Sequence, residues 1–233
     1  MRIKILSLIV CVLPLLVACQ AVPNRDADTI SRTAKAGELS LPEGRRYIVL
    51  HRQSETRFIL QPAGALARLG HPHVIGGPVI DGEIRINDDF HRSGLELSID
   101  VSALQIDHPT WRTDEGFDPE MSDSAIEDTR QNMLSAEQLN ADNHPFIHIE
   151  SISVTGPRWQ PDIEARITLA GESRELTVPV TLEMDEYNLT AIGRFRIRQS
   201  EFGITPFSTA GGSLRVADDV LVRFRIVAMA VDD

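Results

Sequence analysis

Alternation of apolar and polar residues is the feature that most restricts the fold of this chain. From Arg46 onward, short segments repeat it with a period of two, as in residues 95–101, which read LELSIDV. This pattern is typical of strands with one buried and one solvated face. The segments are residues 47–50, 57–60, 82–86, 95–101, 147–150, 163–169, 176–182, 194–198 and 222–226. Eight or so such strands, separated by turn residues, predict an all-β barrel or sandwich.

A closed barrel explains one aspect of the pattern better than a sandwich does. The alternation continues to a last strand near the C-terminus, and closure onto the first strand would remove both exposed edges. One region departs from the pattern, because Ser124–Glu127 and Ser135–Gln138 have capping-box spacing and flank apolar residues at helical spacing. We therefore expect one or two short helices between Ser124 and Asn140. Residues 108–123 before them are predicted to form a long loop.

The N-terminus has the layout of a secretory signal. Arg2 and Lys4 precede an apolar run over residues 5–18, which is shorter than the ~20 residues of a membrane-spanning helix. The sequence Leu-Val-Ala-Cys ending at Cys19 resembles the lipobox of bacterial lipoproteins, which implies cleavage before Cys19 and acyl chains such as palmitate on that residue. Gln20, where an Asp would signal retention, implies an outer-membrane anchor facing the periplasm. The predicted organisation is a signal peptide (1–18), a flexible tether (19–44) and a barrel (45–233).

Cysteine content and charge narrow the expected chemistry. Cys11 would leave with the signal, so Cys19 would be the only mature cysteine and no intramolecular disulfide could form. Loss of the two signal cations would change the net charge from -11 to -13. Such an acidic body argues against nucleic-acid binding and against a basic membrane-binding patch. Membrane attachment is therefore expected through the acylated N-terminus.

Several segments resemble the YceI-like family. They are Ala67–Gly77, Asn132–Leu134 followed by Asn143–Ser151, Phe195–Ile204 and Val216–Val220, and the resemblance extends over roughly Arg46 to Ala230. The most specific is Ser200–Gly203, which reads Ser-Glu-Phe-Gly. Two features depart from the family pattern: Arg68 stands where many members have His, and Gly171 is kept without the Val-Thr-Lys-Pro turn that usually follows it.

This resemblance implies a fold and a function. The expected fold is an extended eight-stranded antiparallel, lipocalin-like barrel, and the expected ligand is a long polyisoprenoid or isoprenoid quinone in its apolar interior. No catalytic residue and no cofactor beyond the bound lipid are expected, and a homodimer is a further expectation because family members often dimerise. The candidates for lining the interior are the alternating apolar residues Ile147, Ile149, Ile167, Leu169, Val178, Val180, Phe195, Ile197, Phe224 and Ile226.

Two alternative functions remain open from the residues themselves. His71 and His73 would face the same way on an extended segment, so both imidazoles could bind one metal ion, as in a metal-dependent protein or enzyme. A third or fourth ligand could come from His51, His91, His108, Asp107 or Glu115. The two histidines could equally be a pair held by hydrogen bonds. The second alternative is a structural or interaction lipoprotein with a solid barrel, because alternation does not distinguish a packed interior from an open one.

Overall fold

The structure is a computed structural model that describes residues 32–33 and 40–232. The strands of these residues are β1 (Arg32–Thr33), β2 (Arg45–Val49), β3 (Glu55–Ala63), β4 (His73–Gly77), β5 (Ile80–Ile86), β6 (Gly94–Asp100), β7 (Gln105–Ile106), β8 (Phe146–Thr155), β9 (Asp162–Leu169), β10 (Glu172–Met184), β11 (Asn188–Arg198), β12 (Ser208–Thr209) and β13 (Leu214–Ala230). The α-helices are α1 (Pro109–Asp114) and α2 (Asp123–Leu134), and the 3-10 helices are η1 (His51–Gln53), η2 (Ala67–Leu69), η3 (Phe90–Arg92), η4 (Val101–Ala103), η5 (Gln199–Phe202) and η6 (Ala210–Gly212).

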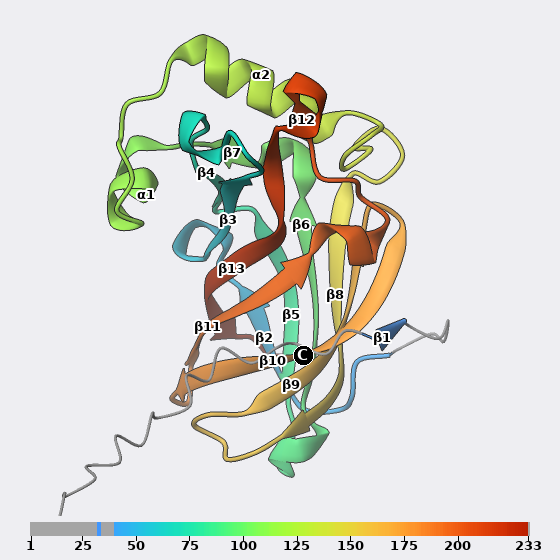
Figure 1. Cartoon of the computed structure of the whole chain (residues 1–233). Helices are drawn as coiled ribbons and strands as arrows, with labels where there is room; N and C mark the ends of the chain where they lie inside the picture. Colours follow the sequence, from blue (N-terminus) through green and yellow to red (C-terminus); the bar gives the residue numbers. More distant parts are fainter. Residues whose placement is uncertain (1–31, 34–39, 233) are drawn as a thin grey trace, which may run out of the picture.

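Eight antiparallel strands close into a barrel, as the alternation predicts (Figure 1). Around the barrel the order is β2, β5, β6, β8, β9, β10, β11 and β13, and β13 returns to β2. The closing contact pairs Ala228 of the last strand with Val49 of the first. The predicted all-β, lipocalin-like barrel with one or two short inserted helices is therefore confirmed.

The long strand β13 extends the barrel at one end. One edge of this 17-residue strand pairs with β11, while its other edge pairs first with β3 and then with β2. The register with β3 shifts between Val216 and Val220, which marks a bulge. Strand β4 pairs with β3, and β7 pairs with β4. These three strands continue the barrel wall along β13 past the end of β2. This arrangement lengthens the interior toward the end of the barrel on which α2 lies (Figure 1).

The N-cap of helix α2 lies two residues before Ser124, the N-cap of the first predicted capping box. The helix N-cap is Ser122, whose side chain accepts a hydrogen bond from the backbone N–H of Ala125. The second box does not begin an α-helix, because Ser135 is the extended C-cap residue of α2 and Asn140 then takes a left-handed φ of 48°. The chain instead makes turns that return it to β8.

Helix α1 lies inside residues 108–123, which the sequence predicted as a long loop. Pro109 occupies its first turn, where the missing N–H costs no hydrogen bond. Trp111 is buried, with the Arg57 guanidinium 5.8 Å from the centre of its ring. Arg57 also forms an ion pair with Asp114 at 3.0 Å. These tertiary contacts with β3 stabilise a six-residue helix that has no strong local signal.

The hairpin between β9 and β10 has the geometry that its sequence requires. Ala170 and Gly171 both have positive φ, 50° and 85°, and they connect the paired residues Leu169 and Glu172. Two central residues with positive φ are characteristic of the type I′ turn, which matches the twist of the flanking strands. The glycine kept from the family pattern therefore has a structural role here, even without the Val-Thr-Lys-Pro sequence.

The predicted signal peptide and Cys19 lie outside the described residues. Within the predicted tether, Arg32–Thr33 form β1 against Glu175 and Arg174 of β10, and Pro42 lies close to Gly94 at the start of β6. In the described part of the chain no helix is long and apolar enough to cross a membrane.

Candidate ligand-binding cavity

Inward-facing side chains of the barrel enclose a cavity of about 290 Å³. Its wall is mainly apolar because each strand directs every second residue inward. The apolar lining comprises Phe58, Leu60, Ile75, Ile80, Ile84, Leu95, Leu97, Ile99, Leu104, Met133, Leu139, Ile147, Ile149, Ile163, Ala165, Ile167, Leu169, Val178, Val180, Ala191, Phe195, Ile197, Ile204, Phe207, Val216, Val220, Val222, Phe224 and Ile226. An apolar space of this kind has few partners for water and is suited to hydrocarbon.

All ten residues selected from the sequence lie on this wall. They are Ile147, Ile149, Ile167, Leu169, Val178, Val180, Phe195, Ile197, Phe224 and Ile226. Their contact with a ligand stays a prediction. The sequence reasoning left out β5 and β6, although Ile84, Leu97 and Ile99 show the same alternation. It also left out the β3–β4 wall, whose place in the lining depends on pairing with β13.

Two aromatic rings narrow the cavity between β11 and β13. Phe195 and Phe224 meet edge to face with their ring centroids 6.3 Å apart. Gly193 makes room for Phe224, because a Cβ at this position would lie 2.5 Å from the Phe224 Cζ. The glycine thus fixes where an aromatic ring enters the interior.

The cavity opens near β12. Phe207 lines the cavity and is also 41% exposed, which places it at a mouth. The Gln138 amide, in the turns after α2, donates a 3.0 Å hydrogen bond to the Thr205 carbonyl across this region. Most of the polar lining residues come from the same end of the barrel: His73, Thr129, Asn132, Gln138 and Gln199. The cavity is therefore apolar over most of its wall and polar toward the end on which α2 lies.

A buried polar network stands behind the wall at β4. The Asp107 carboxylate accepts hydrogen bonds from His73 Nδ1 at 2.6 Å, from the Val74 backbone N–H at 2.9 Å and from Arg112 at 2.8 Å. Burial alone would raise the pKa of Asp107, but the hydrogen bonds from His73 and Val74, together with the charged partners, outweigh it and lower that pKa. The carboxylate is therefore held ionised. Asp107 also has a positive φ of 52°, a backbone conformation uncommon for a residue with a side chain.

His71 and His73 do not share a site. The two rings are 6.0 Å apart and nearly perpendicular, His71 is exposed, and His73 binds Asp107 instead. Among the described residues no group of three or more His, Cys, Asp or Glu side chains is arranged to hold a metal ion. The hydrogen-bonded alternative thus describes His73, with Asp107 as the partner.

Comparison with known proteins agrees with this architecture. The family model of the YceI-like domain matches residues 54–228. The chain belongs to the YceI-like family. The crystal structure of BcnA from Burkholderia cenocepacia superposes with a TM-score of 0.58 at 16% identity, covering 77% of this chain and 98% of BcnA. The YceI protein of Campylobacter jejuni matches with a TM-score of 0.47 at 13% identity, over 66% of this chain and 82% of its own. No curated protein sequence matches the chain.

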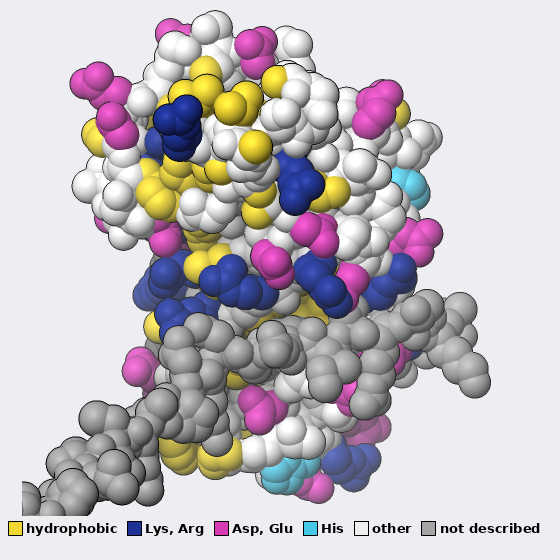
Figure 2. Space-filling model, in the orientation of Figure 1, with side chains coloured by type: hydrophobic (Ala, Val, Ile, Leu, Met, Phe, Trp, Pro, Cys, Tyr) yellow, Lys and Arg dark blue, Asp and Glu magenta, His cyan; other side chains and the backbone are white. Residues whose placement is uncertain are grey.

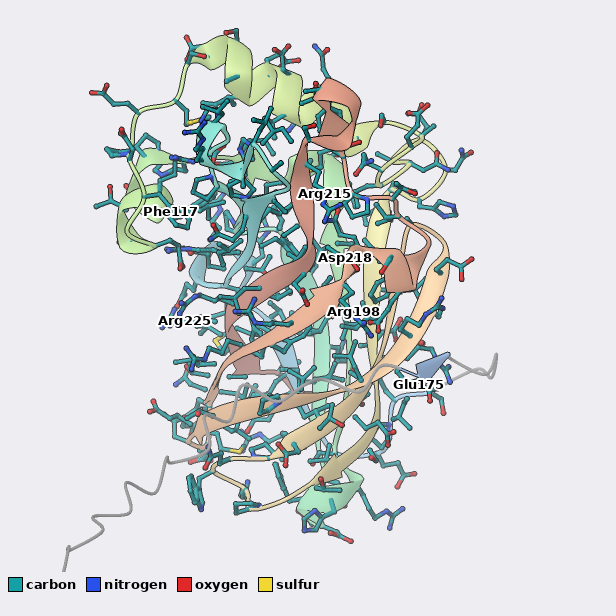
Figure 3. The ribbon with its side chains drawn as sticks, viewed as in Figure 1. Phe117, Glu175, Arg198, Arg215, Asp218 and Arg225 are labelled. Atoms are coloured by element: carbon teal, nitrogen blue, oxygen red, sulfur yellow. The ribbon has the colours of Figure 1, made fainter. Side chains whose placement is uncertain are left out.

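The most specific YceI-like segment proves to be structural. Ser200 donates its hydroxyl to Asp218 at 2.6 Å and its backbone N–H to the other oxygen of the same carboxylate at 2.8 Å. Phe202 is fully buried, and Gly203 ends η5 with a left-handed φ of 72°. Asp218 belongs to the bulge of β13, so two YceI-like motifs meet here. Figure 3 shows Asp218 next to Arg198, where β11 ends.

The outer face of this YceI-like barrel carries a band of arginines (Figure 2). On β11 and β13 it includes Arg194, Arg196, Arg198, Arg223 and Arg225. The register places Arg194 opposite Arg223, while Arg198 lies opposite Asp219 and forms an ion pair with Glu201. Arg223 reaches Glu115 beyond α1 at 3.3 Å. Ion pairs of this exposed kind contribute little to stability.

Proposed function

We propose that this protein binds a long apolar lipid, a polyisoprenoid or an isoprenoid quinone, in the interior of its barrel. The observation that carries the proposal is the cavity of about 290 Å³, which is apolar over most of its wall and polar toward one end. This distribution matches a molecule with a hydrocarbon chain and a small polar head. The protein acts as a carrier or store rather than as an enzyme, and it needs no cofactor besides the lipid.

The energetics favour an occupant for this space. Hydrocarbon inside a space of about 290 Å³ supplies the van der Waals contacts that its apolar lining side chains otherwise lack. Each CH₂ group that leaves water contributes about 0.8 kcal/mol more to binding. These gains offset the cost of ordering a flexible chain. The cavity supports the lipid-binding function over a solid barrel.

The proposed place of action follows from the N-terminus of the sequence. A cleaved signal and an acylated Cys19 would anchor the barrel to the outer membrane on its periplasmic side, because two or more acyl chains give stable attachment. The anchor would hold the cavity close to a source of membrane lipid. Homodimer formation remains an expectation from the family.

Native mass spectrometry of the full chain, isolated in mild detergent and followed by solvent extraction, tests the proposal. We expect one bound isoprenoid per chain. Ala191→Phe, which places a ring in the cavity, should reduce the bound fraction. Thr190→Phe, on the opposite face of the same strand, serves as the matched control and should not. Protein that carries no lipid, and takes up none when incubated with isoprenoid-containing vesicles, would overturn the proposal.

A further inference from the structure

One polar side chain of the cavity has a ring nitrogen that no described residue binds. His73 lies on β4 next to Leu60 of β3, and both line the cavity. Ile75, two residues further along the same face, lines it as well. The His73 Nδ1 donates to Asp107, but within residues 32–33 and 40–232 no group hydrogen-bonds its Nε2.

The ring is held from behind by groups that are themselves almost completely buried. Asp107 and Arg112 are each 1% exposed, and their ion pair is 2.8 Å long. Arg112 also donates to the Pro72 carbonyl at 2.7 Å, directly before His73. A carboxylate bonded to one nitrogen of an imidazole fixes both the orientation and the tautomer of the ring. Burying a charged pair only to position a surface histidine would be costly, so the network indicates a specific task for the ring.

The fixed tautomer determines what Nε2 can bind. An ionised carboxylate only accepts hydrogen bonds, so Nδ1 carries the proton of the neutral ring. In this neutral form of the ring, Nε2 presents a lone pair and acts as an acceptor. An acceptor beside an apolar cavity loses its hydration when a lipid fills that cavity, at a cost unless the lipid supplies a donor.

Most other polar side chains of the wall donate a hydrogen bond to a backbone carbonyl of the protein. The hydroxyls of Thr56 and Thr129 donate to the carbonyls of Arg223 and Ala125. The amides of Gln138 and Gln199 donate to the carbonyls of Thr205 and Ala217. Asn132 of α2 also lines the cavity, but this residue is exposed to solvent. His73 differs from these residues because the almost completely buried Asp107 and Arg112 hold it, so it is the acceptor whose position in the wall is most firmly fixed.

We propose that His73 is the polar anchor of the cavity, and that the natural ligand is an isoprenoid with a hydroxyl head group, an alcohol or a quinol, which donates to Nε2. This inference rests on the proposed lipid-binding function and adds the chemical class of the head group. Asp107 and Arg112 act as positioning residues that hold the imidazole.

The test compares two probes that share one isoprenoid chain and differ in whether the head-group oxygen carries a donor hydrogen or a methyl group. The full chain, stripped of lipid, is titrated by calorimetry with farnesol and with farnesyl methyl ether. One hydrogen bond of ordinary net strength corresponds to about a threefold to tenfold preference for farnesol. His73→Phe should remove this preference while binding of the ether persists. His71→Phe, the same change at an exposed histidine two residues away, should keep it.

The outcomes separate the two proposals. If the wild type binds neither probe, the lipid-binding function fails, and the anchor with it. If it binds both probes equally, the lipid-binding function stands and the anchor is overturned. Should His73→Phe fail to fold, ¹⁵N spectra of the wild-type histidines decide. The Nε2 resonance of the ring bonded to Asp107 should move with farnesol and not with the ether, and an unmoved resonance would refute the anchor.

Discussion

Filling the cavity from the protein side gives a prediction whose sign depends on whether the interior is open. Ala191 lies on β11, faces inward between Leu182 and Ile226, and lines the cavity. In a close-packed core, Ala191→Phe would destabilise the fold by about 1–3 kcal/mol through overpacking. In a cavity of about 290 Å³, the added ring has space and removes apolar surface from water.

The expected gain follows from burial of the ring. Burying a Phe side chain contributes about 1.5–3 kcal/mol. For a domain of this size, each kcal/mol raises Tm by about 2–4 °C, so the lipid-free variant should melt about 3–12 °C above the lipid-free wild type. Thr190→Phe, its outward-facing neighbour, controls for the effect of the ring on the strand itself.

Thermal unfolding of solvent-stripped protein, followed by circular dichroism, measures this shift. The same variant should bind farnesol more weakly, because its ring occupies part of the site. A lower Tm for lipid-free Ala191→Phe, together with an unchanged Tm for the control, would refute the open interior on which the proposed function depends.

Three further predictions concern the buried network of Asp107 and Arg112, the aromatic pair in the cavity and the lipid anchor at Cys19. Asp107→Asn should lower the free energy of unfolding by about 3–5 kcal/mol, because the buried Arg112 loses its counter-charge. The pKa of Asp107 is lowered in the folded state, so its ionised carboxylate stabilises the fold at pH values above the usual pKa of 3.8. This stabilisation is lost as the pH falls toward the folded-state pKa. Denaturant titrations across pH should show the loss in the wild type and not in the variant. Gly193→Ala should cost about 1–3 kcal/mol in the same assay, since its Cβ would lie 2.5 Å from Phe224, and an unchanged midpoint would contradict this. Cys19→Ser should release the protein from the membrane fraction, and continued sedimentation with membranes would exclude the lipid anchor.

Much of the barrel could be predicted because strand alternation is a local property. Every inward residue selected from the sequence lines the cavity, since the direction of a side chain in a strand follows from position alone. The alternation could not predict whether those side chains enclose a cavity, because this depends on how β13 bulges and pairs with β3 and β2. Helix α1 escaped prediction for a similar reason: contacts of Trp111 and Asp114 with Arg57 hold it, and these residues are distant in sequence.

The chemistry of His73 shows a second limit of sequence reasoning. The His-Pro-His spacing drew attention to His71 and His73, and Asp107 was one of five residues predicted as possible further ligands of a metal ion. The structure places Asp107 against His73 as a hydrogen-bond partner, with Arg112 behind it. The buried arginine comes from α1, the helix that local patterns missed. A partner supplied by an unpredicted element cannot be assigned from spacing.

Photo-crosslinking tests the central claim most directly, because it locates the ligand. The full chain is incubated with a diazirine-bearing farnesol, irradiated and mapped by mass spectrometry. Saturable labelling of inward-facing residues such as Ile149, Phe195 and Phe224, competed by unlabelled farnesol, is the predicted result. Labelling confined to outward-facing residues such as Arg196 and Arg225, or labelling that free farnesol does not reduce, would contradict a lipid-filled barrel.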